Sequence, residues 1–405
     1  MSVVDVGAAL RPANNGTPAA IVSQVRVTPD IDGGAGVTEP ASGQPVSLVI
    51  AADGRRAYVV NHSGRATAAA AAAFQHGHPG TVTVLDVAKA LDPVNRGTVN
   101  AIADIIDTGT AGPVGIALTP DQTHLVVSSA EAAGSEDGGD RITLIDTASR
   151  KVVRQVKQAL ASESEGMPQP SSHPAPHASY GRFPNANGVA VSPLGGGTIV
   201  TGNGGTDDVS VISLARALKG EGAELARVPV QTGPFGVAVS PDGRLIAVAC
   251  RENMRTGTEG NAISLIDLAR AISNVGDAEV ARVRVGTDRA EEATRPFAVA
   301  FTRDGRSVLA SCFRSNTISL VEVDKALAGA PAERRLHVAT PDGGPGRPRG
   351  IAMLPDGRHA AVIGGAKAGP GSSLVWIVDI ERLAPVGCVT GVGNESYLLD
   401  VLPVA

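Results

Sequence analysis

The chain has 405 residues, a formal net charge of −5 at pH 7 and 19% charged residues. This mildly acidic balance argues against nucleic acid and against an anionic membrane surface as partners, since both need a basic footprint. Aromatic residues make up only 2% of the chain, whereas hydrophobic residues make up 43%. The core must therefore consist mainly of Val, Ile, Leu and Ala, which suit stacked β-sheets.

Targeting and redox features of the sequence are few. No stretch reaches the roughly 18 uninterrupted apolar residues of a membrane span, and the first residues lack the basic and apolar segments of a signal peptide. Cys250, Cys312 and Cys388 are widely spaced and odd in number, which argues against a disulfide framework. We therefore expect a cytoplasmic protein, and the sequence leaves its oligomeric state undefined.

A short phrase recurs along the chain. An apolar alternation beginning at Phe235 runs into the turn Pro241-Asp242-Gly243-Arg244, and turns of the same type follow alternations at Asp53, Asp304 and Asp356. Proline presets φ, aspartate caps the turn and glycine accepts the left-handed conformation, so each phrase predicts a hairpin. Recurrence of one strand–turn–strand phrase along the chain is typical of a repeat architecture.

Each repeat supplies four strands, and four-stranded antiparallel units of this kind stack radially as the blades of a propeller. The predicted fold class is all-β, a seven-bladed β-propeller that forms one domain over residues 1–405. Six blades are expected near residues 46–110, 112–157, 187–232, 234–286, 295–340 and 346–392. The seventh combines residues 1–30 with 393–405. We expect this closing blade to be thin, because no sequence remains for its second strand.

The turns, the Tyr58-Val59-Val60-Asn61 tetrad and the Ile/Leu-Asp at the end of third strands resemble the YVTN and lactonase-type seven-bladed propellers. The resemblance covers nearly the whole chain and implies the architecture. Such propellers include sugar lactonases, muconate-lactonizing enzymes, antibiotic lyases and surface-layer repeats, so the resemblance does not select one activity. No catalytic motif of the family matches residue by residue.

The connections between strands indicate which face is functional. We number the four strands of each blade 1 to 4 in chain order. In a propeller the connections between strands 1 and 2 and between strands 3 and 4 lie on one face. The connections between strands 2 and 3 and those from blade to blade lie on the other face. The 1–2 turns are tight here, whereas long insertions occur at 61–79, with an alanine run that predicts a short helix, and at about 157–183. Long loops on a compact scaffold are often functional. We therefore expect the functional site at the mouth of the central channel, on the face that carries the connections between strands 2 and 3.

Five of the eight histidines fall in these two insertions: His62, His76, His78, His173 and His177. His62 and His177 are candidates for acid–base catalysis, because histidine carries protons near pH 7. His76, His78 and His173 are candidate ligands of a divalent metal, although their spacing matches no recognised metal motif. A third interpretation, that all five are polar loop residues, also remains open.

A second group of polar residues lies where second strands end and first strands begin: Asn61, Asn203, Arg251, Glu252, Arg295, Arg314 and Arg349. Arginine suits bidentate binding of a carboxylate or phosphate, so convergence of these residues favours a small anionic ligand. The alternative is a solvated rim in which the arginines pair with acidic neighbours such as Glu259. Cys250 and Cys312, at equivalent strand ends, are expected to fill the core.

The sequence thus predicts a small-molecule enzyme with lactonase, lyase or isomerase chemistry on an anionic metabolite at the mouth. Two alternatives remain: a non-catalytic propeller that binds a ligand or protein, and a metal enzyme with histidine ligands. The sequence leaves the cofactor undetermined, with a histidine-ligated divalent metal as the one candidate.

Overall fold

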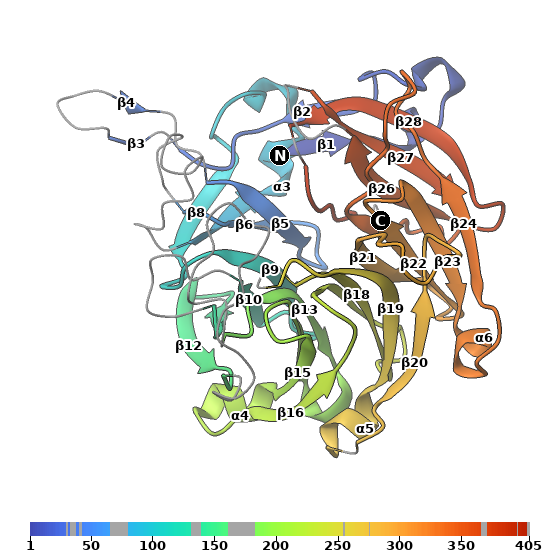
Figure 1. The fold of residues 1–405 in the computed structure, drawn as a ribbon. Coiled ribbons are helices and arrows are strands. Elements are labelled where there is room, and N and C mark those ends of the chain that lie inside the picture. The colour runs from blue at the N-terminus through green and yellow to red at the C-terminus, as the bar shows by residue number, and fades with distance from the viewer. Residues whose placement is uncertain are drawn as a thin grey trace.

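Six four-stranded antiparallel sheets stand around a central axis as the blades of a propeller (Figure 1). The computed structural model describes residues 1–29, 43–64, 80–130, 139–160, 183–253, 256–274, 276–365, 371–394 and 396–402, with the backbone of two short strands, β3 (Ile31–Asp32) and β4 (Thr38–Glu39). Within each blade the strands lie side by side in chain order. The prediction of an all-β propeller with four-stranded antiparallel blades is confirmed.

The strands of the six blades are close in extent to the predicted ranges. Blade 1 consists of β5 (Pro45–Ile50), β6 (Arg56–Asn61), β7 (Thr81–Asp86) and β8 (Ile102–Asp107). Blade 2 consists of β9 (Pro113–Leu118), β10 (His124–Ser129), β11 (Arg141–Asp146) and β12 (Lys151–Lys157). Blade 3 consists of β13 (Ala186–Ser192), β14 (Thr198–Asn203), β15 (Asp208–Ser213) and β16 (Glu224–Pro229). Blade 4 consists of β17 (Pro234–Val239), β18 (Leu245–Glu252), β19 (Glu259–Asp267) and β20 (Glu279–Arg284). Blade 5 consists of β21 (Pro296–Phe301), β22 (Ser307–Cys312), β23 (Thr317–Glu322) and β24 (Glu333–His337). Blade 6 consists of β25 (Ile351–Met353), β26 (His359–Gly365), β27 (Ser373–Asp379) and β28 (Ala384–Gly393).

The first strands of neighbouring blades approach closely, which explains the glycine that recurs in the Gly-Val-Ala-Val phrase. A Cβ on Gly236 would lie 2.6 Å from the carbonyl oxygen of Phe297 in the next blade. A Cβ on Gly350 of blade 6 would lie 2.8 Å from Leu398 Cα. Residues 396–402 therefore occupy, beside blade 6, the place that the next first strand occupies elsewhere.

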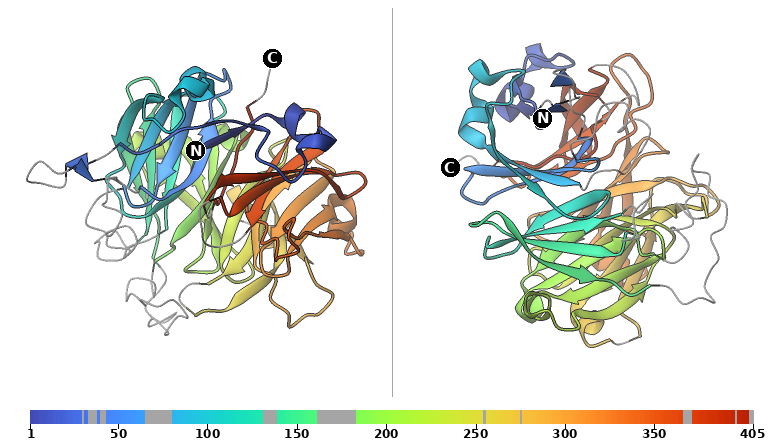
Figure 2. Two further views of the ribbon diagram at one scale, coloured as in Figure 1. Left: turned by 90° about the horizontal axis from the view of Figure 1, so that it is seen from above. Right: turned by 90° about the vertical axis from the view of Figure 1, so that its left-hand side faces the viewer.

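The chain ends meet where the ring closes. β1 (Ser2–Val4) and β2 (Ile21–Gln24) form a two-stranded sheet, and β1 contacts β28 (Figure 2). On the inner side, the Ile50 amide donates a 2.8 Å hydrogen bond to the Asp400 carboxylate. No strand forms among the described residues 396–402. The described part of the chain thus contains six four-stranded blades and a two-stranded closing sheet, and the count of seven stays a prediction.

The 1–2 turns have the predicted chemistry. In blade 4 the Asp242 carboxylate accepts hydrogen bonds from the Ser240 hydroxyl at 2.5 Å and from the Arg244 amide at 3.1 Å. Gly243 between them has a φ of 77°, a conformation that glycine adopts without steric cost. The turn is therefore fixed by local hydrogen bonds.

Short helices follow the third strands, where the sequence had predicted only compact connections. They are α3 (Val87–Leu91), α4 (Leu214–Lys219), α5 (Leu268–Ile272) and α6 (Val323–Leu327), with α1 (Val6–Ala9) after β1; the 3-10 helices are Pro12–Asn14, Pro93–Asn95 and Leu194–Gly196. The Asp267 carboxylate accepts from the Arg270 amide at 3.0 Å. The recurring Ile/Leu-Asp is thus a strand end whose aspartate caps the next helix.

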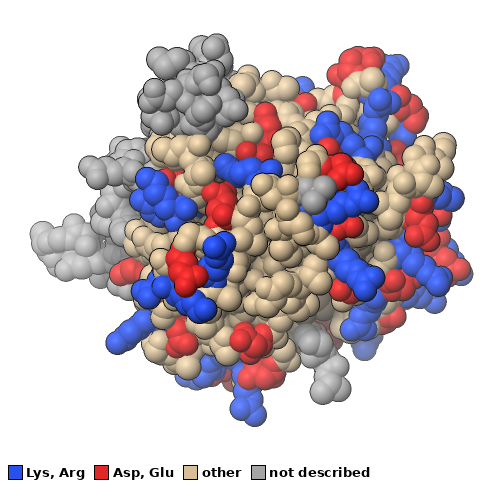
Figure 3. Space-filling model, turned by 90° about the horizontal axis from the view of Figure 1, so that it is seen from below, with Lys and Arg blue, Asp and Glu red and all other residues tan. Residues whose placement is uncertain are grey.

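Packing and surface charge agree with the composition. Buried Val, Ile, Leu and Ala side chains of adjacent blades form shared clusters, for example around Val248 and Val209 of blades 4 and 3. On the side drawn in Figure 3, Lys and Arg side chains are interspersed with Asp and Glu. Among the described residues, no helix is long and apolar enough to cross a membrane.

Candidate functional site

Four residues at or near the ends of second strands share one repeat position. Asn61, Asn203, Cys250 and Cys312 pair with the first residues of their blades' first strands, and all four are fully buried. Successive side chains alternate between the two faces of a strand. The residues that follow are His62, Gly204, Arg251 and Phe313, so His62 is the blade 1 counterpart of Arg251.

Asn61 and Asn203 hold their own blades together. The Asn61 amide nitrogen donates to the hydroxyls of Thr81 and Thr83, at 3.1 and 2.9 Å. The Asn203 amide nitrogen donates to Asp208 at 2.7 Å and to Ser210 at 2.8 Å. These contacts join second to third strands; Asn203 also accepts from the Gln158 amide of blade 2 at 3.1 Å. The structure does not bring either asparagine to the arginines described below.

The histidines are only partly within the described residues. His62 is buried, and its Nδ1 lies 3.3 Å from the carbonyl oxygen of Pro113 in blade 2. His76, His78, His173 and His177, together with the predicted insertion helix, lie outside the described residues. Within the described ranges, no group of three or more His, Cys, Asp or Glu side chains could hold a metal ion. The metal site and the role of His177 stay predictions.

Arg251 lies in an aromatic stack at the start of blades 4 and 5. Its guanidinium carbon is 5.1 Å from the Phe235 ring centroid and 5.2 Å from that of Phe297, and the two rings are 4.6 Å apart. Burial lowers the pKa of Arg251 from its usual value, while ring faces favour the cation. Its Nε has no hydrogen-bond partner in the described structure. The stack therefore holds the guanidinium and leaves a donor unused.

Two carboxylates neutralise the neighbouring arginines. Glu252 lies 2.5 Å from Arg295 through Oε1, and its Oε2 is 3.9 Å from Arg251 Nη2. Glu259 pairs with Arg295 at 2.8 Å and also with Arg314. Glu252 is only 7% exposed. Arg295 thus fixes Glu252 firmly, whereas Arg251 makes only a long contact with that carboxylate.

A second stack surrounds Arg349, which is 1% exposed. Its guanidinium carbon lies 5.4 Å from the Phe313 ring and 5.6 Å from the Tyr397 ring, and its Nη1 donates to the Ser396 carbonyl at 3.2 Å. The Tyr397 and Phe297 rings are 5.9 Å apart. Aromatic contacts therefore connect the Arg349 stack with the Arg251 stack.

Five predicted residues are thereby assembled in one region: Arg251, Glu252, Arg295, Arg314 and Arg349. We call them, with the rings of Phe235, Phe297, Phe313 and Tyr397 and with Glu259, the arginine–aromatic cluster. The sequence analysis missed the four rings. The chain has six Phe, three Tyr and one Trp, so four of its ten aromatic residues lie here. That scarcity, and the shared Pro-Phe at 234–235 and 296–297, were the available signals.

One member of the cluster, Phe235, lines a cavity of about 510 Å³ on the propeller axis. Its wall is formed mainly by first strands and by residues 398–400, and it includes Phe235, Gly236 and Ala298. Phe235 belongs both to this wall and to the Arg251 stack, so its ring connects the guanidinium, which does not itself line the cavity, with the cavity wall. A volume of this size suits a small molecule.

The cysteines are core residues, as expected. Burial raises the pKa of the Cys250 and Cys312 thiols to about 12. Each sulfur lies 3.8 Å from a serine hydroxyl of the adjacent third strand. A thiol that stays protonated is a poor nucleophile, so these side chains fill space between blades.

Solved structures with the same architecture differ widely in sequence. Hydrazine synthase of Kuenenia stuttgartiensis is 19% identical over 91% of this chain and 93% of that one, with a TM-score of 0.60. A periplasmic gluconolactonase of Pseudomonas aeruginosa is 18% identical over 92% and 94%, with a TM-score of 0.59. A 6-phosphogluconolactonase described as putative, from Bacteroides uniformis, is 14% identical over 93% and 92%, with a TM-score of 0.57.

At these identities the likeness shows the fold alone. It supports the resemblance to lactonase-type propellers at the level of architecture. No protein-family model and no curated protein sequence matches the chain.

Proposed function

We propose that this chain is a lactonase-type enzyme that hydrolyses a small anionic lactone beside the axial cavity. The observation that carries the proposal is the Arg251 guanidinium, stacked on Phe235 and Phe297 with an unused Nε donor, next to the carboxylate of Glu252. Two propellers of similar fold are named as a gluconolactonase and a 6-phosphogluconolactonase, which supports this reaction class over the lyase and isomerase alternatives.

The two side chains match the needs of lactone hydrolysis. A water oxygen adds to the lactone carbonyl carbon, the ring C–O bond breaks, and a hydroxy acid is formed. Glu252, held in place by Arg295, takes a proton from the attacking water and returns it to the departing ring oxygen. Arg251 donates to the carbonyl oxygen as its negative charge develops, and its fixed position avoids reorganisation during the step.

His62 is a second candidate proton carrier, because it occupies in blade 1 the repeat position of Arg251. Its Nδ1 contact with the Pro113 carbonyl would fix the ring orientation. We retain His177 as a proposal for the same role. Arg349 and Arg314 belong to the part of the arginine–aromatic cluster nearest blade 6, and we propose that they orient the anionic part of the substrate.

The setting of the site is also part of the proposal. We propose that β1, β2 and residues 396–402 together form the seventh blade. The backbone at Gly350 lies close to that of Leu398, as the backbone at Gly236 lies close to that of Phe297 in the next blade. A cytoplasmic location likewise remains a proposal, based on the sequence features described above.

A pH-stat assay with glucono-lactone and its 6-phosphate tests this function. We expect turnover by the wild type and a fall in kcat of at least about 100-fold in Glu252→Gln, with a smaller change in KM. Glu279→Gln is the matched control, since Glu279 pairs with Arg282 on the fourth strand of the same blade. Absence of turnover with either lactone, or full activity of Glu252→Gln, would contradict the proposal.

A further inference from the structure

The junctions between blades 4 and 5 and between blades 5 and 6 are related by the repeat. Arg251 and Phe313 each follow the cysteine that ends a second strand, and Phe297 and Arg349 each follow the proline before the next first strand. At the first junction Arg251 stacks on Phe297, at 5.2 Å. At the second junction Arg349 stacks on Phe313, at 5.4 Å. The same cation–ring contact thus occurs at both junctions. At the first junction the arginine follows the cysteine and the phenylalanine follows the proline, and at the second junction the two residue types are exchanged.

The two junctions differ in charge. At the first, Arg295 precedes Pro296 and pairs with Glu252 and Glu259 of blade 4. At the second, the counterpart of Arg295 is Arg347, which precedes Pro348. The counterpart of Glu252, two residues beyond the cysteine, is Arg314.

Arg314 pairs backward with Glu259 of blade 4, and the described residues offer Arg347 no ion-pair partner. A position occupied by a carboxylate at one junction is thus occupied by a cation at the next. Arg314 therefore shares one carboxylate, that of Glu259, with Arg295. Asn316 links the backbones of the two arginines: its Oδ1 accepts from the Arg347 amide at 3.0 Å, and its amide nitrogen donates to the Arg314 carbonyl at 3.4 Å.

The backbone at Arg347 has a positive φ, which is unfavourable for a residue other than glycine. The residue at this repeat position has a positive φ in all six blades: 45° at Gln44, 56° at Gly112, 52° at Asn185, 60° at Gly233, 51° at Arg295 and 46° at Arg347. Glycine adopts this conformation readily, whereas a larger residue, above all one before proline, adopts it under strain. Strain of this kind tends to occur at functional sites. Arg347 therefore keeps a long cationic side chain where two other blades have glycine.

We propose that the junction of blades 5 and 6 is a second anion subsite, in which Arg347 and Arg314 bind an additional carboxylate or phosphate of the ligand. The hydroxy acid formed by hydrolysis then carries two separate anionic groups: the carboxylate formed beside Arg251, and the anionic part of the substrate, which Arg314 orients, at this junction. The inference deepens the proposed function and rests on it for the group at Arg251. The guanidinium suits both oxyanions because its fork of N–H donors matches their geometry.

Titration calorimetry at fixed ionic strength tests this inference with succinate and butyrate, which share a four-carbon chain and differ by one carboxylate. We expect the wild type to bind succinate at least 10-fold more tightly than butyrate. Arg347→Gly should weaken succinate binding about 10-fold and leave butyrate binding within twofold. Gln44→Gly is the control, since Gln44 holds the same repeat position in blade 1 with a φ of 45°, and it should change neither affinity.

Arg347→Gly should fold, because the backbone there already has a conformation that glycine accepts. Arg314→Gln, on a side chain that is 58% exposed, is a second variant and should also lower the preference for succinate. Inorganic phosphate and acetate, titrated separately, show which oxyanion the subsite prefers: a loss of phosphate binding alone in Arg347→Gly would assign it to phosphate.

Equal affinities for succinate and butyrate, binding of neither, or an unchanged preference in Arg347→Gly would overturn the inference. The outcome is separable from that of the proposed function. An Arg347-dependent preference without lactone turnover would refute only the reaction, whereas lactone turnover without the preference would refute only the second subsite.

Discussion

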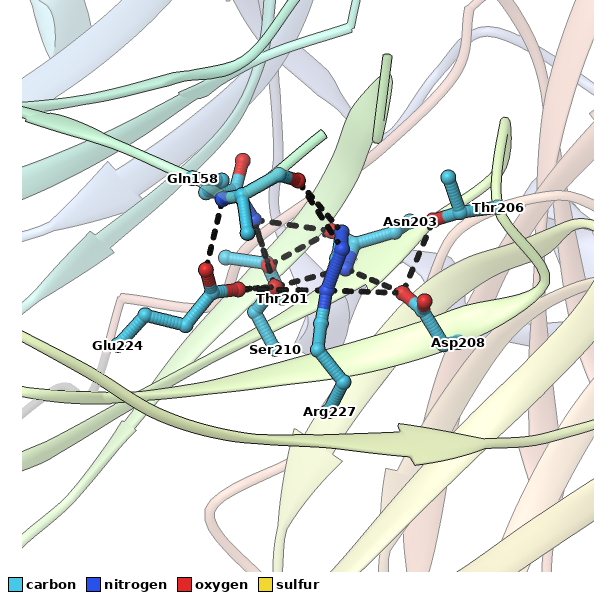
Figure 4. A network of polar contacts seen from close by, with 9 residues as sticks. Gln158, Thr201, Asn203, Thr206, Asp208, Ser210, Glu224 and Arg227 are labelled. Atoms are coloured by element: carbon cyan, nitrogen blue, oxygen red, sulfur yellow. Dashed lines mark hydrogen bonds and ion pairs between the residues drawn. The ribbon is translucent and has the colours of Figure 1, made fainter. Parts of the chain in front are cut away.

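Asp208 provides a test of the buried polar network between blades 2 and 3 (Figure 4). Burial raises the pKa of Asp208 from 3.8 to about 6, although Arg227 lies 3.5 Å away and hydrogen bonds from Asn203 and Thr206 favour the charged form. The folded pKa is above the unfolded value. The neutral carboxyl thus contributes stability that is fully present below about pH 4 and is lost as the pH rises through about 6. The difference of roughly two pKa units corresponds to about 3 kcal/mol.

Replacing Asp208 with Asn removes this titration. Urea unfolding of the wild type and Asp208→Asn at pH 4 and pH 7.5 should show the variant gaining about 2 kcal/mol on the wild type between the two pH values. Asp379→Asn is a control of opposite sign, because hydrogen bonds from the Arg382 amide and Arg358 lower the pKa of Asp379. The free energy of unfolding of Asp379→Asn should therefore fall relative to that of the wild type as the pH rises. The reasoning is refuted if the free-energy difference between Asp208→Asn and the wild type is the same at both pH values.

Two further predictions concern packing. Gly236→Ala should lower the free energy of unfolding by about 1–3 kcal/mol, since its Cβ would lie 2.6 Å from the Phe297 carbonyl oxygen; Gly222→Ala, with nothing within 4 Å, should not destabilise the fold in the same urea titration. Cys250 and Cys312, with thiol pKa values of about 12, should resist alkylation by iodoacetamide at pH 8 until urea unfolds the chain. Mass spectrometry that finds either thiol modified in the native protein would contradict this burial.

The sequence was sufficient to predict strand order and turn chemistry, because those depend on local residues. The Asp242 turn and the strand phrases follow from alternation and from residues two or three apart. The helices after the third strands were missed because the aspartate at a strand end also works as a helix cap. The Ala-rich sequence of these connections also favours a helix.

The structure brings together five of the seven predicted substrate-binding residues, and strand geometry explains the separate location of the other two. Arg251, Glu252, Arg295, Arg314 and Arg349 come together, whereas Asn61 and Asn203 occupy the buried repeat position of Cys250. A shift of one residue along a strand moves a side chain to the opposite face. The four aromatic rings went unnoticed because their contacts join different blades, and sequence periodicity within one blade does not reveal such contacts.

The central claim is that Arg251 acts on the substrate rather than only bracing the rim. We would measure kcat/KM for lactone hydrolysis by Arg251→Met, which retains an apolar side chain against Phe235 and Phe297, and by the control Arg282→Met, which removes an arginine from β20 of the same blade. The account predicts a fall of at least about 100-fold, or about 3 kcal/mol, in Arg251→Met alone, with little change in its free energy of unfolding. Wild-type kcat/KM in Arg251→Met would contradict it.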